Sequence, residues 1–150
     1  MTYTLFSRLI AGELPASFVH EDHLCVAFMD INPMSPGHVL VVPREPVATL
    51  TELPPETVSH LMAVAVRVGD AQRKALGSLA QHLLINDGKA ASQSVPHVHI
   101  HVIPRYRSDV AKVTSRMLWH VSTLMLPVYA SKSKRAKLDF VAKKIKNSFY

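Results

Sequence analysis

The residues with the clearest chemical potential are three histidines at alternate positions, His97, His99 and His101, in a chain of 150 residues that holds nine histidines. Successive side chains of a β-strand point to opposite faces, so this spacing predicts three imidazoles on one face. The apolar residues between them would point to the other face and anchor the strand in a core. Each ring has two nitrogens that need hydrogen-bond partners, so packing alone does not explain three rings on one edge.

Two kinds of chemistry compete for these imidazoles. They could bind zinc, which accepts imidazole ligands and keeps an open coordination position in catalytic sites. Alternatively, one histidine could be a nucleophile whose tautomer is fixed by a neighbouring acceptor. The preceding loop, residues 86–94, favours the nucleophile, because small, amide and hydroxyl residues can offer hydrogen-bond donors to phosphate oxygens. A metal site would favour a carboxylate or another hydrogen-bond acceptor close by, and the acid nearest in the sequence is Asp87.

The elements that must position these residues can be predicted from the sequence pattern. Short runs of apolar or β-branched residues indicate five strands, at residues 17–21, 24–30, 38–42, 79–86 and 96–104. A long helix is predicted from about Leu53 to Leu76, with prolines in its first turn and Gly77 after its end. A short helix over residues 5–11 would end at Gly12. Because most links are short, these elements predict an antiparallel α+β meander rather than βαβ repeats.

The C-terminal part of the chain gives a weaker pattern. Residues 105–131 indicate no definite element, and Met117–Tyr129 fits a helix and a strand equally well. Residues 137–150 predict an amphipathic helix, with lysines off an apolar face that carries Leu138, Val141, Ala142, Ile145 and Phe149.

The positive charge of the chain is concentrated in this last segment. Residues 132–150 contain seven basic residues and one acid, which account for the entire formal charge of +6. The body that carries the three histidines is therefore neutral, and its anion binding must come from loop amides, Ser94 and the histidines. We expect the basic segment to be a solvated helix face rather than a nucleic-acid-binding surface.

Composition limits the class of protein further. One domain is the expectation at this length, and a hydrophobic content of 48% is typical of a globular chain. The single cysteine, Cys25, excludes a disulfide framework and a Cys-pair zinc site. The sequence has neither a signal-peptide pattern nor an apolar run of roughly 18 residues, so we expect a cytoplasmic protein without a membrane contact.

The segment from Gln93 to Ile103 resembles the signature of the histidine triad (HIT) nucleotide hydrolases and transferases, His-φ-His-φ-His-φ-φ with φ apolar. Residues 5–13, 28–33 and 36–43 resemble further segments of that family in the same order, so the resemblance covers roughly residues 3–107. It implies a HIT-like fold with a five-stranded antiparallel sheet, one long helix, a short N-terminal helix and a C-terminal amphipathic helix. We therefore expect a catalytic domain over 1–107 and an extension over 108–150, packed on the same domain or on a dimer partner.

The resemblance also implies roles for individual residues. His99 matches the nucleophile that attacks the α-phosphate and forms a nucleotidyl-histidine, while the His97 backbone carbonyl would hold its Nδ1–H. His101 and Ser94 match phosphate-contacting positions, and His38 matches a fourth active-site histidine. The positions that match the nucleotide-binding residues are Asp30 for the ribose hydroxyls, Asn86, Ser92 and Gln93 in the loop, and Leu5, Phe6, Leu9, Phe28 and Ile31 around the nucleobase.

The implied substrates are purine nucleotides, with adenine first, and the implied assembly is a homodimer whose two sheets join. The sequence is more similar to the dinucleoside-polyphosphate hydrolases than to the phosphoramidase branch, because Pro104-Arg-Tyr-Arg107 follows the histidines where that branch has Gly-Gly. Two alternatives remain open: a phosphoramidate hydrolase, and a non-catalytic nucleotide- or metal-binding protein. We expect no required cofactor. The structural zinc of some bacterial relatives should also be missing, since Thr4 and Ser7 replace its two cysteines.

Overall fold

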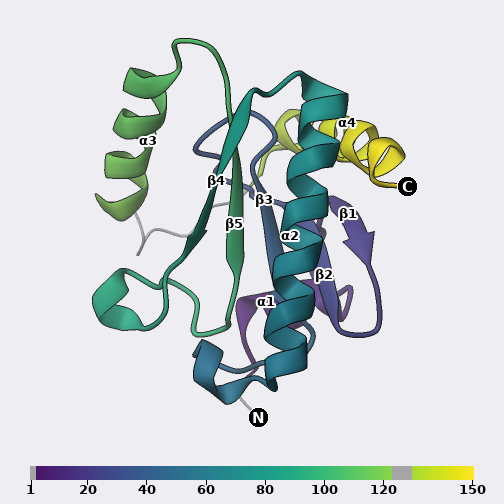
Figure 1. Ribbon diagram of the computed structural model, residues 1–150, viewed down its shortest axis with the longest axis vertical. Helices are drawn as coiled ribbons and strands as arrows, with labels where there is room; N and C mark the ends of the chain where they lie inside the picture. The colour runs from purple at the N-terminus through teal and green to yellow at the C-terminus, as the bar shows by residue number, and fades with distance from the viewer. Residues whose placement is uncertain (1–2, 123–129) are drawn as a thin grey trace.

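The computed structural model describes residues 3–122 and 130–150. Its centre is a five-stranded sheet in which all neighbouring strands are antiparallel, with the order β1-β2-β3-β5-β4 (Figure 1). The α+β fold class expected from the sequence is confirmed. The strands are β1 (Phe18–Glu21), β2 (Cys25–Met29), β3 (Val39–Pro43), β4 (Ala80–Ile85) and β5 (Ile100–Arg105).

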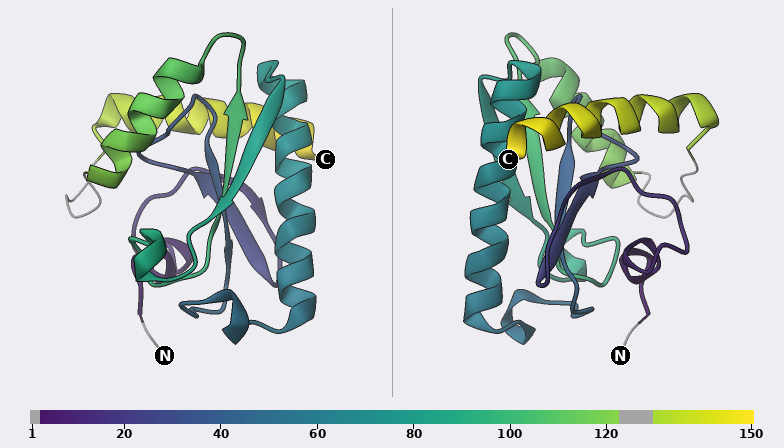
Figure 2. Two further views of the ribbon diagram at one scale, coloured as in Figure 1. Left: turned by 60° about the vertical axis from the view of Figure 1, so that its left-hand side comes forward. Right: turned by 90° about the vertical axis from the view of Figure 1, so that its right-hand side faces the viewer.

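Helices lie on both sides of this sheet. The helices are α1 (Leu5–Ile10), α2 (Pro55–Leu76), α3 (Val110–Ser122) and α4 (Lys132–Phe149), with short 3-10 turns η1 (Leu50–Glu52) and η2 (Lys89–Ala91). Helix α2 runs along one face, while α1 lies on the other side of the strands (Figure 2). Helix α2 ends at Gly77, which adopts a left-handed φ of 69° and donates its N–H to the Arg73 carbonyl, as the sequence predicts for a helix stop. The connection through α2 brings the chain back at the outer edge, so β4 lies beyond β5.

Two apolar cores explain why all of β2 is buried. Cys25, Ala27 and Met29 pack in the larger core with α2, and Val26 and Phe28 belong to a smaller core with α1. Both faces of the strand are therefore covered by helices, and an uninterrupted apolar run follows from that position.

Helix α4 begins five residues earlier than the sequence pattern suggests, and it runs across α2 and the β1 side of the sheet (Figure 2). The Ser131 side chain caps its first turn by accepting from the Lys134 N–H. Its buried residues are Leu138, Ala142, Ile145 and Phe149. The apolar face expected from the sequence therefore packs on the same chain, with Val141 only partly buried.

The segment that the sequence left without a definite element contains a helix. Helix α3 occupies residues 110–122, and residues 123–129 of the ambiguous Met117–Tyr129 stretch lie outside the described residues. Within the described ranges, no helix combines the length and the apolar character that crossing a membrane requires.

Candidate active site

The three alternate histidines lie at and just before the start of β5. The β3 pairing begins at Ile100, so His97 and His99 lie in the segment that precedes the ladder, with His97 in a bend. All three imidazoles are buried, whereas the alternating Val98, Ile100 and Val102 pack in the core with α2. The histidines thus face away from α2, toward the side of the sheet that carries α1.

A backbone hydrogen bond fixes the tautomer of His99. Its Nδ1 lies 2.8 Å from the carbonyl oxygen of His97. A carbonyl oxygen can only accept, so Nδ1 carries the hydrogen and, in the neutral ring, the lone pair is on Nε2. The edge of the Phe6 ring packs on this imidazole, with 5.2 Å between ring centroids. His99 is consequently oriented as a nitrogen nucleophile would need to be.

The imidazole of His97 lies behind His99 and is held by two hydrogen bonds. Its Nε2–H donates to the Pro43 carbonyl at 2.8 Å, so its Nδ1 accepts from the Thr4 hydroxyl, also at 2.8 Å. Burial lowers the pKa of His97, which keeps the ring neutral. His97 thereby ties the start of α1 to the end of β3.

Thr4 and Ser7 also decide whether the zinc site of some bacterial relatives could exist here. The Thr4 hydroxyl caps α1 by accepting from the Ser7 N–H at 3.1 Å, and Ser7 Oγ accepts from the Thr4 N–H at 3.2 Å. Neutral hydroxyls used in this way are poor zinc donors compared with the thiolates they replace. The residues present therefore do not fit that zinc, and a hydrogen-bonded helix cap occupies its position.

His38 and His101 form a second oriented pair. The Met34 N–H donates to His38 Nδ1 at 3.2 Å, and His38 Nε2 lies 3.0 Å from His101 Nδ1. In neutral His38, the hydrogen is then on Nε2 and is donated to His101, which leaves the His101 hydrogen on its own Nε2. Asp30 Oδ2 is 3.5 Å from His38 Nδ1. The pair thus presents a hydrogen-bond donor, His101 Nε2–H, at the cleft.

The acid nearest these histidines in space is Asp30, not Asp87 as the sequence separation suggested. Ligand atoms of Asp30, His38 and His101 lie within 4.8 Å of one another. Asp87 is directed elsewhere, and its carboxylate accepts from the Leu50 N–H at 3.0 Å. Asp30, which the resemblance places in the site, is brought beside the histidines by the end of β2, so the position of Asp87 in the sequence does not identify the neighbouring carboxylate. The observation that favours a nucleophile is the hydrogen bond from His99 Nδ1–H to the His97 carbonyl.

A cleft of about 860 Å³ opens in front of His99 and His101, between α1, the end of β2 and α4. The predicted site residues that line it are Leu5, Phe6, Leu9, Phe28, Asp30, Ile31, Ser94, His99 and His101. The structure therefore brings the apolar set, the carboxylate and two of the histidines to one cavity. His38 and His97 lie behind this surface and orient the residues that form it.

The three predicted loop residues, Asn86, Ser92 and Gln93, brace the loop rather than line the cleft. The Gln93 side chain donates to the Ala48 carbonyl at 2.8 Å and accepts from the Gly88 N–H at 3.1 Å. The Asn86 amide donates to the Ser92 carbonyl at 3.4 Å, and Ser92 has a left-handed φ of 63°. The side chains of Asn86 and Gln93 and the backbone of Ser92 thus shape the turn that carries Ser94.

Sequence reasoning missed one wall of the cleft, which belongs to α4. Lys132, Arg135 and Asp139 of α4 line the cleft on the side opposite α1. The Ser17 hydroxyl donates to Asp139 Oδ1 at 2.5 Å and accepts from Arg135 at 3.3 Å. A signal was present: Asp139 is the single acid of a basic segment and stands one helical turn after Arg135.

The site therefore combines an antiparallel sheet, a buried histidine whose tautomer is fixed by a backbone carbonyl, and an apolar cleft that holds one carboxylate. A family model described as the HIT domain matches residues 11–108. The chain belongs to the HIT domain family, a nucleotide-binding family of hydrolase and transferase type, and the resemblance stated from the sequence is confirmed at that level.

Several known proteins are similar to the chain. An uncharacterized HIT-like protein of Mycobacterium tuberculosis is 40% identical over 114 residues, which cover 76% of this chain and 79% of that one. The adenylylsulfatase HINT3 of Arabidopsis thaliana is 40% identical over 105 residues, 70% of this chain and 53% of that one. A zinc-bound histidine triad family protein of Mycobacterium smegmatis superposes with a TM-score of 0.75 at 30% identity, covering 97% of this chain and 91% of that one.

Proposed function

We propose that the protein is a phosphohydrolase or nucleotidyltransferase that acts at the α-phosphate of adenine nucleotide derivatives such as dinucleoside polyphosphates. The observation that carries the proposal is the bond from His99 Nδ1–H to the His97 carbonyl, because it leaves the Nε2 lone pair for attack in a ring that lines the cleft. The sequence pattern that follows the histidines favours the dinucleoside-polyphosphate hydrolases over the phosphoramidase branch.

The reaction has two displacements at the same phosphorus. In the first, His99 Nε2 forms a bond to the α-phosphorus, and the bond from phosphorus to the leaving-group oxygen breaks with its electron pair. In the second, the oxygen of water or phosphate attacks the α-phosphorus, and the P–N bond returns its electrons to His99. Splitting one difficult displacement into two is the advantage of a covalent intermediate.

The surrounding groups suit the charges that develop. In the intermediate the imidazole is cationic, and the His97 carbonyl dipole stabilises it through Nδ1–H. His101 Nε2–H and Ser94 can donate to phosphate oxygens from the same cavity. This scheme needs no metal and no organic cofactor.

The remaining cleft residues support a nucleotide as the ligand. Leu5, Leu9 and Phe28 form an apolar wall on which a purine can stack, and Asp30 offers a carboxylate for ribose hydroxyls.

A second candidate substrate comes from the Arabidopsis relative, whose name identifies it as an adenylylsulfatase. Adenylyl sulfate places a sulfate leaving group on the same α-phosphorus, so His99 would act in the same way. A phosphoramidate, with a P–N bond in that position, is the further alternative. The three substrates differ only in the leaving group, and a parallel assay with a dinucleoside polyphosphate, adenylyl sulfate and adenosine 5′-phosphoramidate ranks them by kcat/KM.

Replacement of the nucleophile tests the proposal. His99→Ala should lower turnover by about 10³-fold or more, as loss of other covalent nucleophiles does, while AMP binding persists. Lys74→Ala, which changes an exposed residue of α2, is the control. Wild-type protein quenched during turnover should carry an acid-labile nucleotidyl group that the His99 variant lacks. Near-wild-type turnover of His99→Ala would overturn the mechanism, and binding of nucleotide without turnover of any substrate by the wild type would favour a non-catalytic binding protein.

The proposed assembly is a homodimer, and the proposed location is the cytoplasm, where nucleotides are abundant. Strand β4 supports the assembly, because it is an edge strand with Leu83 exposed and with exposed Leu79 directly before it, and a second sheet could pair with it. A molar mass measured by light scattering on the eluting protein distinguishes the dimer from a monomer.

A further inference from the structure

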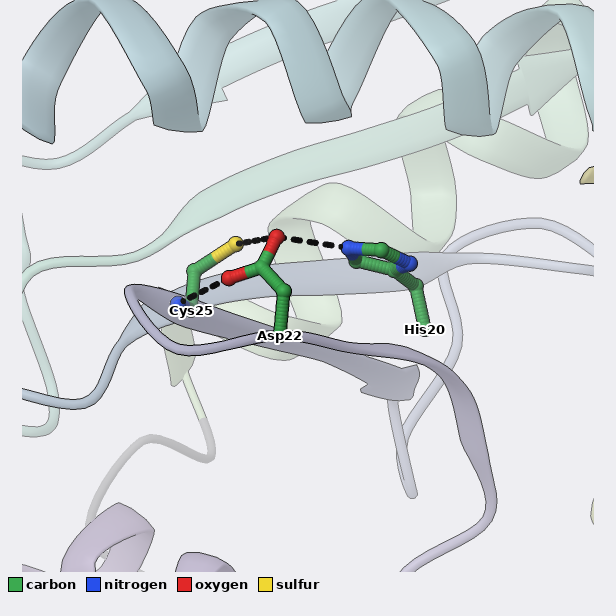
Figure 3. Close-up of side chains that lie close together, drawn as sticks. All are labelled: His20, Asp22 and Cys25. Atoms are coloured by element: carbon green, nitrogen blue, oxygen red, sulfur yellow. Dashed lines mark hydrogen bonds and ion pairs between the residues drawn. The ribbon is translucent and has the colours of Figure 1, made fainter.

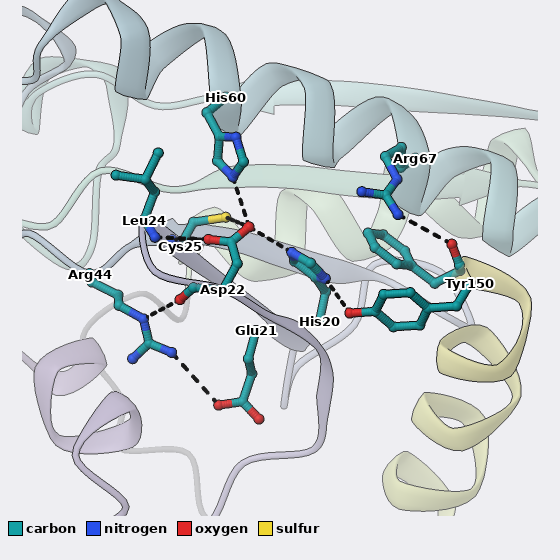
Figure 4. A network of polar contacts seen from close by, with 10 residues as sticks. His20, Glu21, Asp22, Leu24, Cys25, Arg44, His60, Arg67 and Tyr150 are labelled. Carbon is teal, nitrogen blue, oxygen red and sulfur yellow. Dashed lines mark hydrogen bonds and ion pairs between the residues drawn. The ribbon is translucent and has the colours of Figure 1, made fainter.

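A second cluster of polar side chains lies at the turn between β1 and β2, among residues that do not line the cleft. Asp22 Oδ2 is its centre, at 2.8 Å from His20 Nε2 and 2.7 Å from His60 Nε2 (Figure 4). Cys25 Sγ lies 3.7 Å from the same oxygen (Figure 3). The four side chains come from β1, the turn, β2 and helix α2, and three of them contact the same carboxylate oxygen of the fourth, Asp22.

We propose that this cluster binds a divalent transition-metal ion, zinc first, through His20 Nε2, Asp22 Oδ2, Cys25 Sγ and His60 Nε2. Imidazole nitrogen, carboxylate oxygen and thiolate sulfur are the donors that zinc prefers, and four of them complete a tetrahedral structural site. The site is separate from the family zinc that Thr4 and Ser7 do not support. None of its four ligands is among the site residues predicted from the sequence.

The distances fit an ion with a small adjustment. The ligand atoms of His20, Asp22 and Cys25 lie within 4.8 Å of one another. Zinc bonds of about 2.0–2.3 Å place tetrahedral donors roughly 3.3–3.8 Å apart. The nitrogens of His20 and His60 would therefore move away from Asp22 Oδ2 by about half an ångström, and Cys25 Sγ is already at the required separation from that oxygen. His60 lies outside the 4.8 Å group, so its imidazole must also turn toward the ion.

The neighbouring groups orient the donors. The Tyr150 hydroxyl lies 2.8 Å from His20 Nδ1, where it can accept the Nδ1–H and leave the Nε2 lone pair for the ion. Asp22 Oδ1 accepts from the backbone N–H groups of Leu24 and Cys25, each at 2.8 Å. The other carboxylate oxygen, Oδ2, is then directed at the histidines. Such hydrogen bonds behind the ligands are typical of protein metal sites.

Charge and access are also compatible with a cation. Asp22 and a Cys25 thiolate supply two negative charges, which balance a divalent ion. The nearest guanidinium, that of Arg44, is bound to the Asp22 backbone carbonyl at 2.6 Å and lies 3.9 Å from Glu21. Cys25 is fully buried, but the side chains of Asp22 and His60 are 20% and 32% exposed and give an ion a route from solvent.

Binding of the ion must displace a proton. Burial raises the pKa of the Cys25 thiol to about 12, so in the metal-free protein Sγ–H donates to Asp22 Oδ2. Burial would also raise the pKa of Asp22, but hydrogen bonds from His20, the Cys25 N–H and His60 hold it well below its usual range. On binding, the Cys25 S–H bond breaks, its proton leaves to solvent and the sulfur–metal bond forms. The hydrogens that His20 and His60 donate from Nε2 in the metal-free protein move to Nδ1 of the same rings, so that each Nε2 lone pair can bind the ion.

Cobalt substitution tests the site without relying on enzyme activity. Full-length protein is stripped with a chelator and titrated with CoCl₂, because thiolate-bound Co²⁺ gives a sulfur-to-metal charge-transfer band in the near ultraviolet. Cys25 is the single cysteine of the chain, so this band can arise only from the proposed site and not from the Asp30, His38 and His101 group. We expect one equivalent of Co²⁺ to saturate the band and one equivalent of ZnCl₂ to abolish it.

Two variants make the result specific. His60→Ala removes a half-exposed ligand on α2 and should weaken Co²⁺ binding by at least about tenfold. His82→Ala removes an exposed histidine of β4 and should leave the titration unchanged. Circular dichroism of each variant verifies folding. No charge-transfer band in the wild type, or an equal affinity in His60→Ala, would show that Asp22 is only the hydrogen-bonded centre of a turn.

Discussion

The Thr4 hydroxyl offers a direct test of how α1 is attached to the catalytic strand. Thr4 is 5% exposed, and its hydroxyl both donates to the fully buried His97 Nδ1 and accepts from the Ser7 N–H. Thr4→Val keeps the shape of the side chain but removes both bonds. An unsatisfied buried acceptor costs about 1–3 kcal/mol, and a lost helix cap about 1 kcal/mol. The variant should therefore be less stable by about 2–4 kcal/mol.

The measurement is urea unfolding followed by fluorescence, supported by a thermal scan in which Tm should fall by on the order of 5–15 °C. Thr4→Ser keeps the hydroxyl and should lose less than about 1 kcal/mol. Ser131→Ala is the matched control, because Ser131 caps α4 at an exposed end without contacting a buried ring. If Thr4→Val costs no more than about 0.5 kcal/mol beyond Ser131→Ala, the buried His97 contact does not contribute as reasoned.

Two further predictions concern pH and the α4 wall. Burial lowers the pKa of His97 below its usual value of 6.5, so below that pH the unfolded chain binds more protons than the folded one. The free energy of unfolding should therefore decrease as pH falls below 6.5, by up to about 1.4 kcal/mol per pH unit. In urea titrations at several pH values, His97→Gln should show a smaller decrease per pH unit than the wild type, and equal decreases would contradict this account. At the cleft wall, Arg135→Ala or Asp139→Asn should raise KM by about threefold to tenfold with little change in kcat, as loss of one polar contact does. Lys143→Ala, on an exposed face of the same helix, is the control, and an unchanged KM in both wall variants would exclude a ligand contact.

Features that depend on residues close in sequence could be predicted. The alternate spacing of the histidines, the helix stop at Gly77 and the apolar face of α4 follow from local periodicity and backbone preference. The start of β5 could not, because it depends on where β3 offers partners, and that pairing begins at Ile100. The α+β class followed from short links, whereas the outer position of β4 depends on the path of α2.

The missed parts of the site are contacts between distant residues. Thr4 meets His97 across 93 positions, and Ser17 meets Asp139 across 122. The contact between Asp30, a predicted site residue, and His38 depends on the pairing of β2 with β3, which sequence separation does not report. Periodicity reports which face of an element is buried, but it does not report which other element covers that face.

The wall that α4 contributes to the cleft lies outside the family match, which ends at residue 108. The groups proposed to make and break bonds at phosphorus are therefore encoded in one stretch of the gene, and part of the surface that would select the ligand is encoded in another. A C-terminal segment of different sequence could be exchanged during evolution while His99 and its hydrogen bonds stayed as they are. Relatives with the same chemistry could therefore differ in substrate specificity through changes in the last forty residues alone, which make up roughly a quarter of the chain.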